Sequence, residues 1–382
     1  MSSNGLKILK KEDLGKSIGV VVGTRPGIVK FAPVIRYLTE TNANFFVIHT
    51  GQHYSYNMDA QFFLDLELPP PQYTNKTVRK YKTHGGQTAE MIKAVEAACL
   101  IERPAVFIVG GDANTNLASA LAVRKLGAIK LAHMEAGLRS NDWRMPEEHN
   151  RGMIDRISDI LFAPTETAVR NLKDEKVKGR VYLTGNTIVD AVYQNRKIAA
   201  SRSHVLTKMG LSEGEYFVLT LHREENVDSS INLANILEGI RSVSECFEKP
   251  IVFPVHPRTR KRLDQFFPKG HLKAFNGLKM IKPVGYLDFL QLLSHSALVM
   301  TDSGGIQEES CILQVPCVTL RENTERPETV QVGSNVIAGT RPVDIVGSVQ
   351  KMMRISERDW PNPYGDGAAS RRIADILVRE CD

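Results

Sequence analysis

Short apolar runs recur along the chain, separated by polar stretches that often contain glycine. The runs are continuous rather than alternating, which is typical of parallel strands covered by helices on both faces. Helical patterns lie between the runs, so the first half predicts a doubly wound α/β domain. The strands predicted in this half are 18–22, 45–49, 105–109, 128–133, 160–163 and 181–184.

The same strand–helix series begins again after a polar stretch around 194–203. The strands predicted in the second half are 216–221, 251–255, 279–281, 298–301 and 317–320. Two series predict an α/β fold of two doubly wound, Rossmann-like domains that face a cleft. We expect a polar tail at 1–16, a first domain at 17–195, a second domain at 196–362, and a C-terminal helix within 363–382 that crosses back to the first domain.

Composition narrows the class of protein. The chain has 382 residues, 42% of them hydrophobic, so each of two domains can bury a core. A net charge of +6 is too small to indicate nucleic acid, but it suits an anionic small substrate. We find no apolar run of the ~20 residues that span a bilayer and no signal peptide. The five cysteines lack CxxC spacing, which favours free thiols and a cytoplasmic location.

Polar residues of interest stand just after the predicted strands. In open α/β sheets, ligands bind outside the carboxyl ends of the strands. Polar loops would explain any one of these residues, but the recurrence at strand after strand favours a ligand site. The residues are Arg25, Gln52, Asp112, Glu135, His222, His256 and Ser303.

The segment TDSGGIQEE at 301–309 is typical of a nucleotide site. Gly304 and Gly305 allow a ligand to approach the backbone, and the following helix offers free N–H groups and a positive dipole end to a diphosphate. Glu309 lies one to two turns into that helix, where a carboxylate could accept hydrogen bonds from ribose hydroxyls. The alternative is an ordinary turn in which Ser303 caps the helix.

Three cations are candidates for the same diphosphate. Arg326 follows in the second half, whereas Arg25 and Lys30 could come from the first domain. Arginine suits phosphate because its planar guanidinium donates two hydrogen bonds at once. Arg25 is the least typical of a solvated surface charge, because it stands in a tight strand-to-helix turn.

Carboxylates cluster in the first half, although they would repel an anionic ligand. Asp112 and Glu135 follow strands, and Glu147 and Glu148 form a pair in a polar stretch. Acid–base chemistry gives a reason for such clustering, since proximity raises the pKa of a carboxyl group. Helix capping and local salt bridges are the structural alternative. His222 is either an acid, base or phosphate ligand, or a buried hydrogen-bonded histidine.

Several cofactor motifs do not occur in the sequence. No GxGxxG follows a strand, and neither GxxxxGK[ST] nor HExxH is present. No cluster of histidines and cysteines has metal-ligand spacing. We therefore expect no nicotinamide, ATP or metal cofactor.

At these residues the chain closely resembles the non-hydrolysing UDP-N-acetylglucosamine 2-epimerases. The resemblance runs from about residue 17 to residue 378. The motifs that carry it are GTRPGIVKFAPVI (23–35), HTGQHY (49–54), GGDANTN (110–116), HMEAGLRSNDWRMPEEHNR (133–151), APTE (163–166), TGNTIVDA (184–191), LTLHREENVD (219–228), PVHPR (254–258), TDSGGIQEE (301–309), RENTERPE (321–328) and NPYGDGAAS (362–370).

The resemblance implies a GT-B-like fold and an isomerase that acts on a UDP-sugar, as a homodimer without cofactor. Family catalytic roles fall on Asp112, Glu135, Glu147 and His222, and Lys30 matches a functional lysine. Gln52 matches a contact of a second, activating substrate molecule. Nucleotide contacts fall on Arg25, His256, Ser303, Gly304, Gly305, Glu309 and Arg326.

The implied reaction is reversible epimerisation at C2 of UDP-N-acetylglucosamine, by elimination and re-addition of UDP through a 2-acetamidoglucal. A GT-B-type glycosyltransferase, a hydrolysing epimerase and a catalytically silent sugar-nucleotide sensor are alternatives. Relatives that epimerise a diacetamido uronic acid sugar share WRMPEEHNR at 143–151, but they usually begin with a GARPQ-like motif, and Thr24 argues against them.

Overall fold

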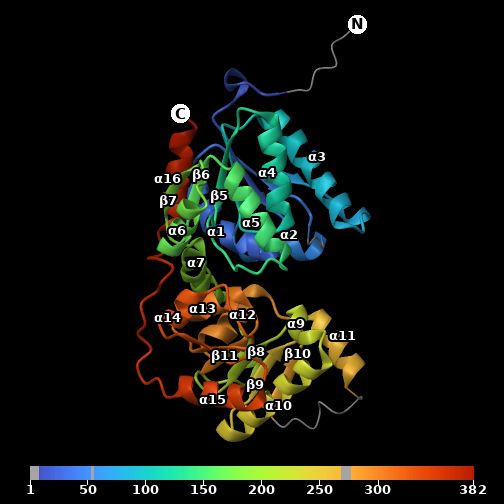
Figure 1. Cartoon of the computed structure of the whole chain (residues 1–382), viewed down its shortest axis with the longest axis vertical. Coiled ribbons are helices and arrows are strands. Elements are labelled where there is room, and N and C mark those ends of the chain that lie inside the picture. Colours follow the sequence, from blue (N-terminus) through green and yellow to red (C-terminus); the bar gives the residue numbers. More distant parts are fainter. Residues whose placement is uncertain (1–7, 53–55, 268–276) are drawn as a thin grey trace. The chain divides into compact units, whose positions relative to one another are not determined.

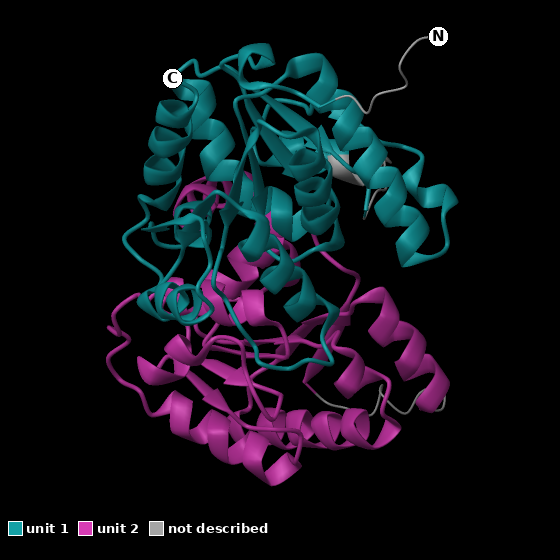
Figure 2. Ribbon diagram, turned by 45° about the horizontal axis from the view of Figure 1, so that its top comes forward, with its two compact units in different colours: residues 1–191, 364–382 teal, residues 192–363 magenta. Residues whose placement is uncertain are grey.

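The computed structural model describes residues 8–52, 56–267 and 277–382, and these residues form two compact units. Unit 1 contains residues up to 191 together with 364–382, and unit 2 contains residues 192–363 (Figure 2). Each unit is a parallel sheet with helices packed on it (Figure 1). We describe each unit by itself.

Unit 1 is built on a seven-stranded sheet in the order β3-β2-β1-β4-β5-β6-β7, with every neighbouring pair parallel. Chain order reverses between β1 and β4, the kind of switch point where α/β sheets bind ligands. Both strands are buried along their whole length, as expected for parallel strands covered on two faces. The strands are β1 Ile18–Val22, β2 Phe45–His49, β3 Tyr73–Thr74, β4 Val106–Gly110, β5 Lys130–Met134, β6 Ile160–Ala163 and β7 Arg180–Leu183.

Helices cover this sheet, and one of them comes from the far end of the chain. Helix α16 (Ala369–Glu380) packs against α1 (Arg25–Glu40), as Figure 1 shows. The buried Asp190 carboxylate accepts hydrogen bonds from the Ser370 N–H at 2.9 Å and the Ala369 N–H at 3.3 Å, which anchors the start of α16. The other α-helices are α2 Tyr56–Asp65, α3 His84–Glu102, α4 Asn114–Leu126, α5 Pro146–Ile157, α6 Glu166–Asp174 and α7 Thr187–Arg202, which continues into unit 2.

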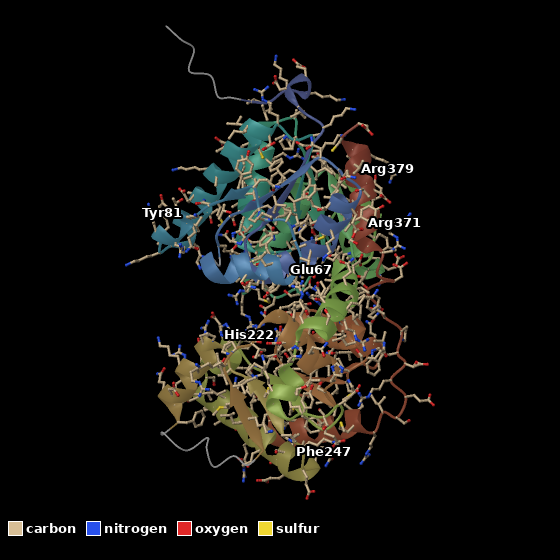
Figure 3. The ribbon with its side chains drawn as sticks, turned by 180° about the vertical axis from the view of Figure 1, so that it is seen from behind. Glu67, Tyr81, His222, Phe247, Arg371 and Arg379 are labelled. Carbon is tan, nitrogen blue, oxygen red and sulfur yellow. The ribbon has the colours of Figure 1, made fainter. Side chains whose placement is uncertain are left out.

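Unit 2 has a six-stranded parallel sheet in the order β10-β9-β8-β11-β12-β13. Helix α10 (Ser230–Phe247) packs on α15 (Pro342–Met353), and Phe247 at its end (labelled in Figure 3) meets Phe217 edge-on at a ring-centroid distance of 5.6 Å. The strands are β8 Phe217–Thr220, β9 Ile251–Pro254, β10 Leu278–Ile281, β11 Leu298–Thr301, β12 Cys317–Thr319 and β13 Asn335–Ile337. The other helices are α8 Val205–Met209, α9 Glu224–Val227, α11 Pro257–Phe266, α12 Tyr286–Ser294, α13 Gly304–Ile312 and α14 Pro327–Gln331.

The two parallel sheets confirm the predicted pair of doubly wound α/β folds. Every predicted strand is present, with ends displaced by at most two residues. The sequence did not predict β3 and β13, which are two and three residues long and too short to show a pattern. Among the helices that the structure describes, none is both long and apolar enough to cross a membrane.

Candidate active site

The turn after β1 places Arg25 at the first position of α1. Thr24 caps this helix, because its hydroxyl accepts the Gly27 N–H at 3.2 Å. Gly23 is required by close packing: a Cβ there would lie 2.2 Å from the Thr115 hydroxyl and 2.3 Å from that of Thr50. The strand end of β1 therefore sits directly against the start of α4.

One turn into α1, Lys30 reaches the predicted catalytic Glu135. The Lys30 Nζ lies 2.7 Å from Glu135 Oε2, and only 4% of the Glu135 side chain is exposed. Glu135 has φ of 68°, a left-handed conformation that non-glycine residues adopt at a cost of ~1–3 kcal/mol. Its Oε1 is buried and accepts no hydrogen bond from any described residue. A strained backbone and an unsatisfied buried oxygen are features of a functional carboxylate.

Asp112 lies two residues after the end of β4 and is held by Arg151 of α5. One terminal nitrogen of the buried Arg151 guanidinium bonds the Asp112 carboxylate, and the other lies 2.6 Å from Glu148. The Asn150 side-chain amide donates to the Asp112 carbonyl at 2.8 Å. Helix α5 is therefore fixed to the end of β4 by two side chains.

The paired glutamates of α5 have different surroundings. Glu148 is buried and accepts hydrogen bonds from the Ser140 N–H at 2.9 Å, the Ser140 hydroxyl at 2.8 Å and the Asn141 N–H at 3.1 Å. Burial alone would raise the pKa of Glu148, but Ser140 and Arg151 hold it below its usual value. Glu147 is half-buried in the first turn of α5, and no described residue forms a hydrogen bond or ion pair with its carboxylate. Glu148 is thus committed to the loop before α5, whereas Glu147 is open to a ligand.

Gln52 lies at the same edge of the sheet. Its side-chain carbonyl accepts hydrogen bonds from both the N–H and the hydroxyl of Thr115, each at 2.8 Å. Thr115 stands in the first turn of α4. The amide of Gln52 is therefore held in one orientation next to the loops that carry Asp112 and Arg25.

In unit 2, Asp302 organises the end of β8 around His222. The carboxylate of Asp302 is fully buried and accepts the backbone N–H groups of His222 and Arg223, each at 3.0 Å, and the side-chain amide of Asn226 at 3.2 Å. Burial would raise the pKa of Asp302, but contact with His222 holds it below its usual value.

The His222 ring is oriented by the same carboxylate, because its Nδ1 lies 3.1 Å from Asp302 Oδ1. With Nδ1 donating to a carboxylate, Nε2 is left to act on a ligand. The side chain is 38% exposed, and Figure 3 labels this residue in unit 2. His222 is therefore a partly exposed residue and not a buried core histidine.

His256 stands at the start of α11, with its ring centroid 6.0 Å from that of His222. Its Nδ1 accepts the Arg258 N–H at 3.3 Å, which leaves Nε2 as the protonated nitrogen of a neutral ring. Although the residue is exposed, desolvation by adjacent protein atoms, followed by the charges of His222 and Arg258, lowers the pKa of His256. The ring is therefore a neutral hydrogen-bond donor at pH 7.

Helix α13 begins with the glycine pair Gly304 and Gly305. Ser303 is its N-cap residue, but the Ser303 side chain makes no capping hydrogen bond, so the capping alternative is wrong. A Cβ at Gly305 would meet nothing within 4 Å. The first N–H groups of the helix are therefore not covered by a serine cap, the arrangement in which helix ends bind anions.

Arg326 adds positive charge beside this helix end. A Cβ placed on Gly304 would lie 3.9 Å from the guanidinium carbon of Arg326. Arg326 is buried and its Nε donates to Glu308 of α13 at 2.6 Å, so it is a fixed, ion-paired cation rather than a mobile surface arginine. Glu309, the predicted ribose ligand, is buried in the second turn of the helix.

The structure thus brings Arg25, Lys30, Gln52, Asp112, Glu135 and Glu147 to one edge of the unit 1 sheet, and His222, His256, Ser303, Gly304, Gly305, Glu309 and Arg326 to one edge of the unit 2 sheet. Sequence reasoning named Arg139, Arg144 and Arg151 as possible salt-bridge partners of these carboxylates but did not single out Arg151, which pairs with both Asp112 and Glu148. The signal that could have found it is spacing, because Arg151 follows Glu147 by four residues and Glu148 by three on one helix. Within the described residues, no group of three or more His, Cys, Asp and Glu side chains could hold a metal ion.

Known proteins resemble the chain over nearly its whole length. The family described as UDP-N-acetylglucosamine 2-epimerase matches residues 36–378. The UDP-N-acetylglucosamine 2-epimerase of Methanocaldococcus jannaschii is 49% identical over 364 residues, which is 94% of this chain and 98% of the relative. The UDP-2,3-diacetamido-2,3-dideoxy-D-glucuronate 2-epimerase of Pseudomonas aeruginosa is 38% identical over 94% of this chain and 98% of its own length.

Solved structures agree in fold as well as sequence. The structure of M. jannaschii UDP-GlcNAc 2-epimerase in complex with UDP-GlcNAc and UDP has a TM-score of 0.86 and 48% identity, and the match covers 95% of this chain and 99% of that one. These matches confirm the predicted GT-B-like α/β fold and the resemblance in the motifs. The chain therefore belongs to the UDP-N-acetylglucosamine 2-epimerase family, and it is an isomerase.

Proposed function

We propose that the chain interconverts UDP-N-acetylglucosamine and UDP-N-acetylmannosamine by eliminating UDP and adding it back. The observation that carries the proposal is the set of three carboxylates, Asp112, Glu135 and Glu147, at one sheet edge, two of them with cationic partners. The 49% identity to an enzyme named for this substrate supports it further.

The chemistry needs two acid–base groups and a stabilised leaving group. No carbonyl adjoins C2 of the sugar, so its proton is hard to remove unless the C1–O bond to UDP breaks as well. In the forward step a base takes the C2 proton, a C1=C2 double bond forms, and UDP departs with the electron pair of the C1–O bond. In the return step C2 is protonated on the opposite face and a UDP oxygen attacks C1.

The ion pairs divide the carboxylates into two kinds. Asp112 forms an ion pair with Arg151, and Glu135 forms one with Lys30. Glu147 has no such partner among the described residues. We therefore assign the base that removes the C2 proton to Asp112 or Glu135, and the acid that protonates the opposite face to Glu147.

The leaving diphosphate is assigned to unit 2. Gly304 and Gly305 at the start of α13 offer N–H groups, and Arg326 adds a fixed cation. The Ser303 N–H already donates to the Thr301 hydroxyl at 3.0 Å, so Ser303 is assigned through its own hydroxyl. Such preorganised donors stabilise charge that develops as a leaving group departs. Glu309 and His256 are assigned to the nucleoside, and His222 to acid–base or phosphate contact. Arg25 and Lys30 stay predicted contacts of the anion. Activation through Gln52, a homodimer, a two-domain division at 195 and a cytoplasmic location stay predictions.

One incubation tests the reaction. The protein is mixed with UDP-N-acetylglucosamine alone in D₂O, and the sugar is followed by NMR. We expect UDP-N-acetylmannosamine with deuterium at C2, and slow deuterium uptake into recovered substrate, because the carrying group exchanges its proton with water. Retention of the original C2 hydrogen would contradict elimination, and an unchanged sugar nucleotide would contradict the epimerase assignment.

Two further arms sharpen the result. In Glu147→Gln, deuterium should still wash into substrate while epimer formation falls ~10²–10⁴-fold, since only the acid of the return step is lost. Loss of the base should suppress both, so Asp112→Asn and Glu135→Gln show which of these two carboxylates removes the C2 proton. The diacetamido uronic acid sugar nucleotide, the substrate named for the 38% identical relative, serves as the competing substrate. Faster turnover of that sugar would reassign the specificity while leaving the mechanism in place.

A further inference from the structure

A buried histidine is connected to the three segments that carry the candidate catalytic carboxylates. His133 stands in β5, two residues before Glu135, and is fully buried. Its Nδ1 lies 2.7 Å from Asp155 Oδ1, and its Nε2 lies 3.2 Å from the carbonyl oxygen of Gly111. The ring therefore spans the space between the end of β4 and helix α5.

Both neighbours of this ring accept hydrogen bonds. The Gly111 carbonyl can only accept. Asp155 is fully buried, which would raise its pKa, but the charges and hydrogen bonds of His133 and Arg139 hold that pKa below its usual value, so the group is an ionised acceptor. A ring with one proton would point a nitrogen lone pair at an oxygen lone pair on one side. Two protons satisfy both contacts.

We propose that His133 is a permanently buried imidazolium, and that the His133–Asp155 ion pair is the positioning device for the acid–base groups. Neither residue is exposed to substrate, so both act through the carboxylates they hold. This inference rests on the proposed function, because it concerns the same three carboxylates. It gives a role to His133 and Asp155, to which neither the sequence motifs nor the proposed mechanism assigned one.

The His133–Asp155 pair contacts the chain near Glu135, near Asp112 and in the helix that carries Glu147. Asp155 Oδ2 accepts the Gly137 N–H at 3.1 Å, so the pair grips the chain two residues before and two residues after the left-handed Glu135. Gly111, which the ring bonds, directly precedes Asp112. Asp155 itself lies in α5, the helix that carries Glu147.

The charges around the pair balance. Arg139 donates to Asp155 at 2.7 Å and to Glu175 at 2.6 Å, and Glu175 is partly exposed. Two cations, His133 and Arg139, thus face two anions, Asp155 and Glu175. A buried charge is tolerated when it is paired and hydrogen-bonded in this way.

The first test reads the ring directly. In wild-type protein with ¹⁵N-labelled histidine, NMR between pH 6 and 8 should show one ring whose two N–H protons both exchange slowly with water. The His133→Gln variant should lose those two signals, which assigns them. A His133 ring with a single proton in that range would overturn the imidazolium. This measurement needs no catalytic activity, so it stands apart from the proposed function.

The second test separates positioning from folding. Asp155→Asn removes the charge while keeping the shape, and a displacement of about 1 Å at a reacting group costs ~10²-fold in rate. We expect kcat for epimerisation to fall ~10²-fold with KM and UDP affinity within about twofold, because the UDP contacts assigned to unit 2 do not involve Asp155. Glu175→Gln is the matched control, since it removes an ion pair of the same network at its exposed end, and it should keep kcat within about threefold.

The outcomes are distinguishable. Wild type without epimerase activity defeats the proposed function and leaves the NMR result to decide the protonation of His133. Active wild type with a folded Asp155→Asn variant of normal kcat overturns the positioning role, as does an equal loss in Glu175→Gln. If Asp155→Asn fails to fold, His133→Gln is assayed in its place, and the same loss of kcat at constant UDP affinity is required.

Discussion

The start of α13 offers a substitution whose effects on stability and on binding are expected to have opposite signs. Gly305 is the second residue of this helix, and a Cβ there would meet no atom within 4 Å. Gly305→Ala should therefore fold normally, and the helix should gain up to ~0.5–1 kcal/mol because alanine loses less backbone entropy than glycine. The same methyl group would stand where a diphosphate must approach the helix N–H groups.

The size of the binding loss follows from the contact that the methyl group would block. A hydrogen bond to a charged group is worth ~1.5–3 kcal/mol, and every 1.4 kcal/mol is a factor of ten in affinity. Loss of one N–H contact to phosphate should thus weaken UDP binding ~10- to 100-fold. The thermal midpoint without ligand should rise by ~1–3 °C or stay the same.

Calorimetric titration with UDP and a thermal melt of the ligand-free protein measure the two effects. Gly347→Ala is the matched control, because Gly347 also lies inside a helix of unit 2, α15, with open space at its Cβ position. It should show the same small change in stability with unaltered UDP affinity. Wild-type UDP affinity in Gly305→Ala would refute a diphosphate site at α13, and a large loss of stability would show that the glycine is structural.

Three other predictions concern neighbouring or buried charges and metal removal. Glu148→Gln should destabilise the fold by ~3–5 kcal/mol, because it breaks a buried pair with Arg151, whereas Glu147→Gln should leave the denaturant midpoint unchanged; equal midpoints would contradict the division of the pair. Burial would raise the pKa of Glu325, but Arg321 lowers it to about 2. The carboxylate therefore contributes roughly 2–3 kcal/mol to the free energy of unfolding above pH ~4.5, and this contribution is lost as the pH falls toward 2. Glu325→Gln should flatten the acid side of a stability–pH profile, and an unchanged slope would contradict the ion pair. Exhaustive chelation should leave turnover unaltered, and activity restored by one added metal would disprove metal-free chemistry.

The sequence predicted most strands of the two sheets, because buried parallel strands appear in a sequence as continuous apolar runs. Strands β1 and β2 were placed to the residue. Strands β3 and β13 were missed because Tyr73–Thr74 and Asn335–Ile337 pair by backbone at the sheet edges and carry no run of their own. A short edge strand depends on its neighbour, which a local pattern cannot reveal.

The candidate site was predicted in its residue types but not in its internal division. The residue pattern alone treated Glu147 and Glu148 as a pair, and the family resemblance singled out Glu147. The contacts of Ser140 and Arg151 with Glu148 give the physical difference between them. The partner of a buried charge can lie far along the chain, as with Lys30 and Glu135, and such a pair is decided by the fold and not by spacing. His133 and Asp155 carried no signal for the same reason.

The return of α16 to unit 1 bears on how the chain is made. Ile373 and Leu377 of α16 are buried in unit 1, and the carboxylate of Asp190 accepts a hydrogen bond from the backbone N–H of Ser370. A ribosome must therefore synthesise all of unit 2 before the first unit can close. Unit 2, which is continuous in sequence, can complete its fold earlier, so the order of folding during synthesis is the reverse of the order in which the two units begin. A premature stop just before Ala369 would spare unit 2 and leave unit 1 without α16.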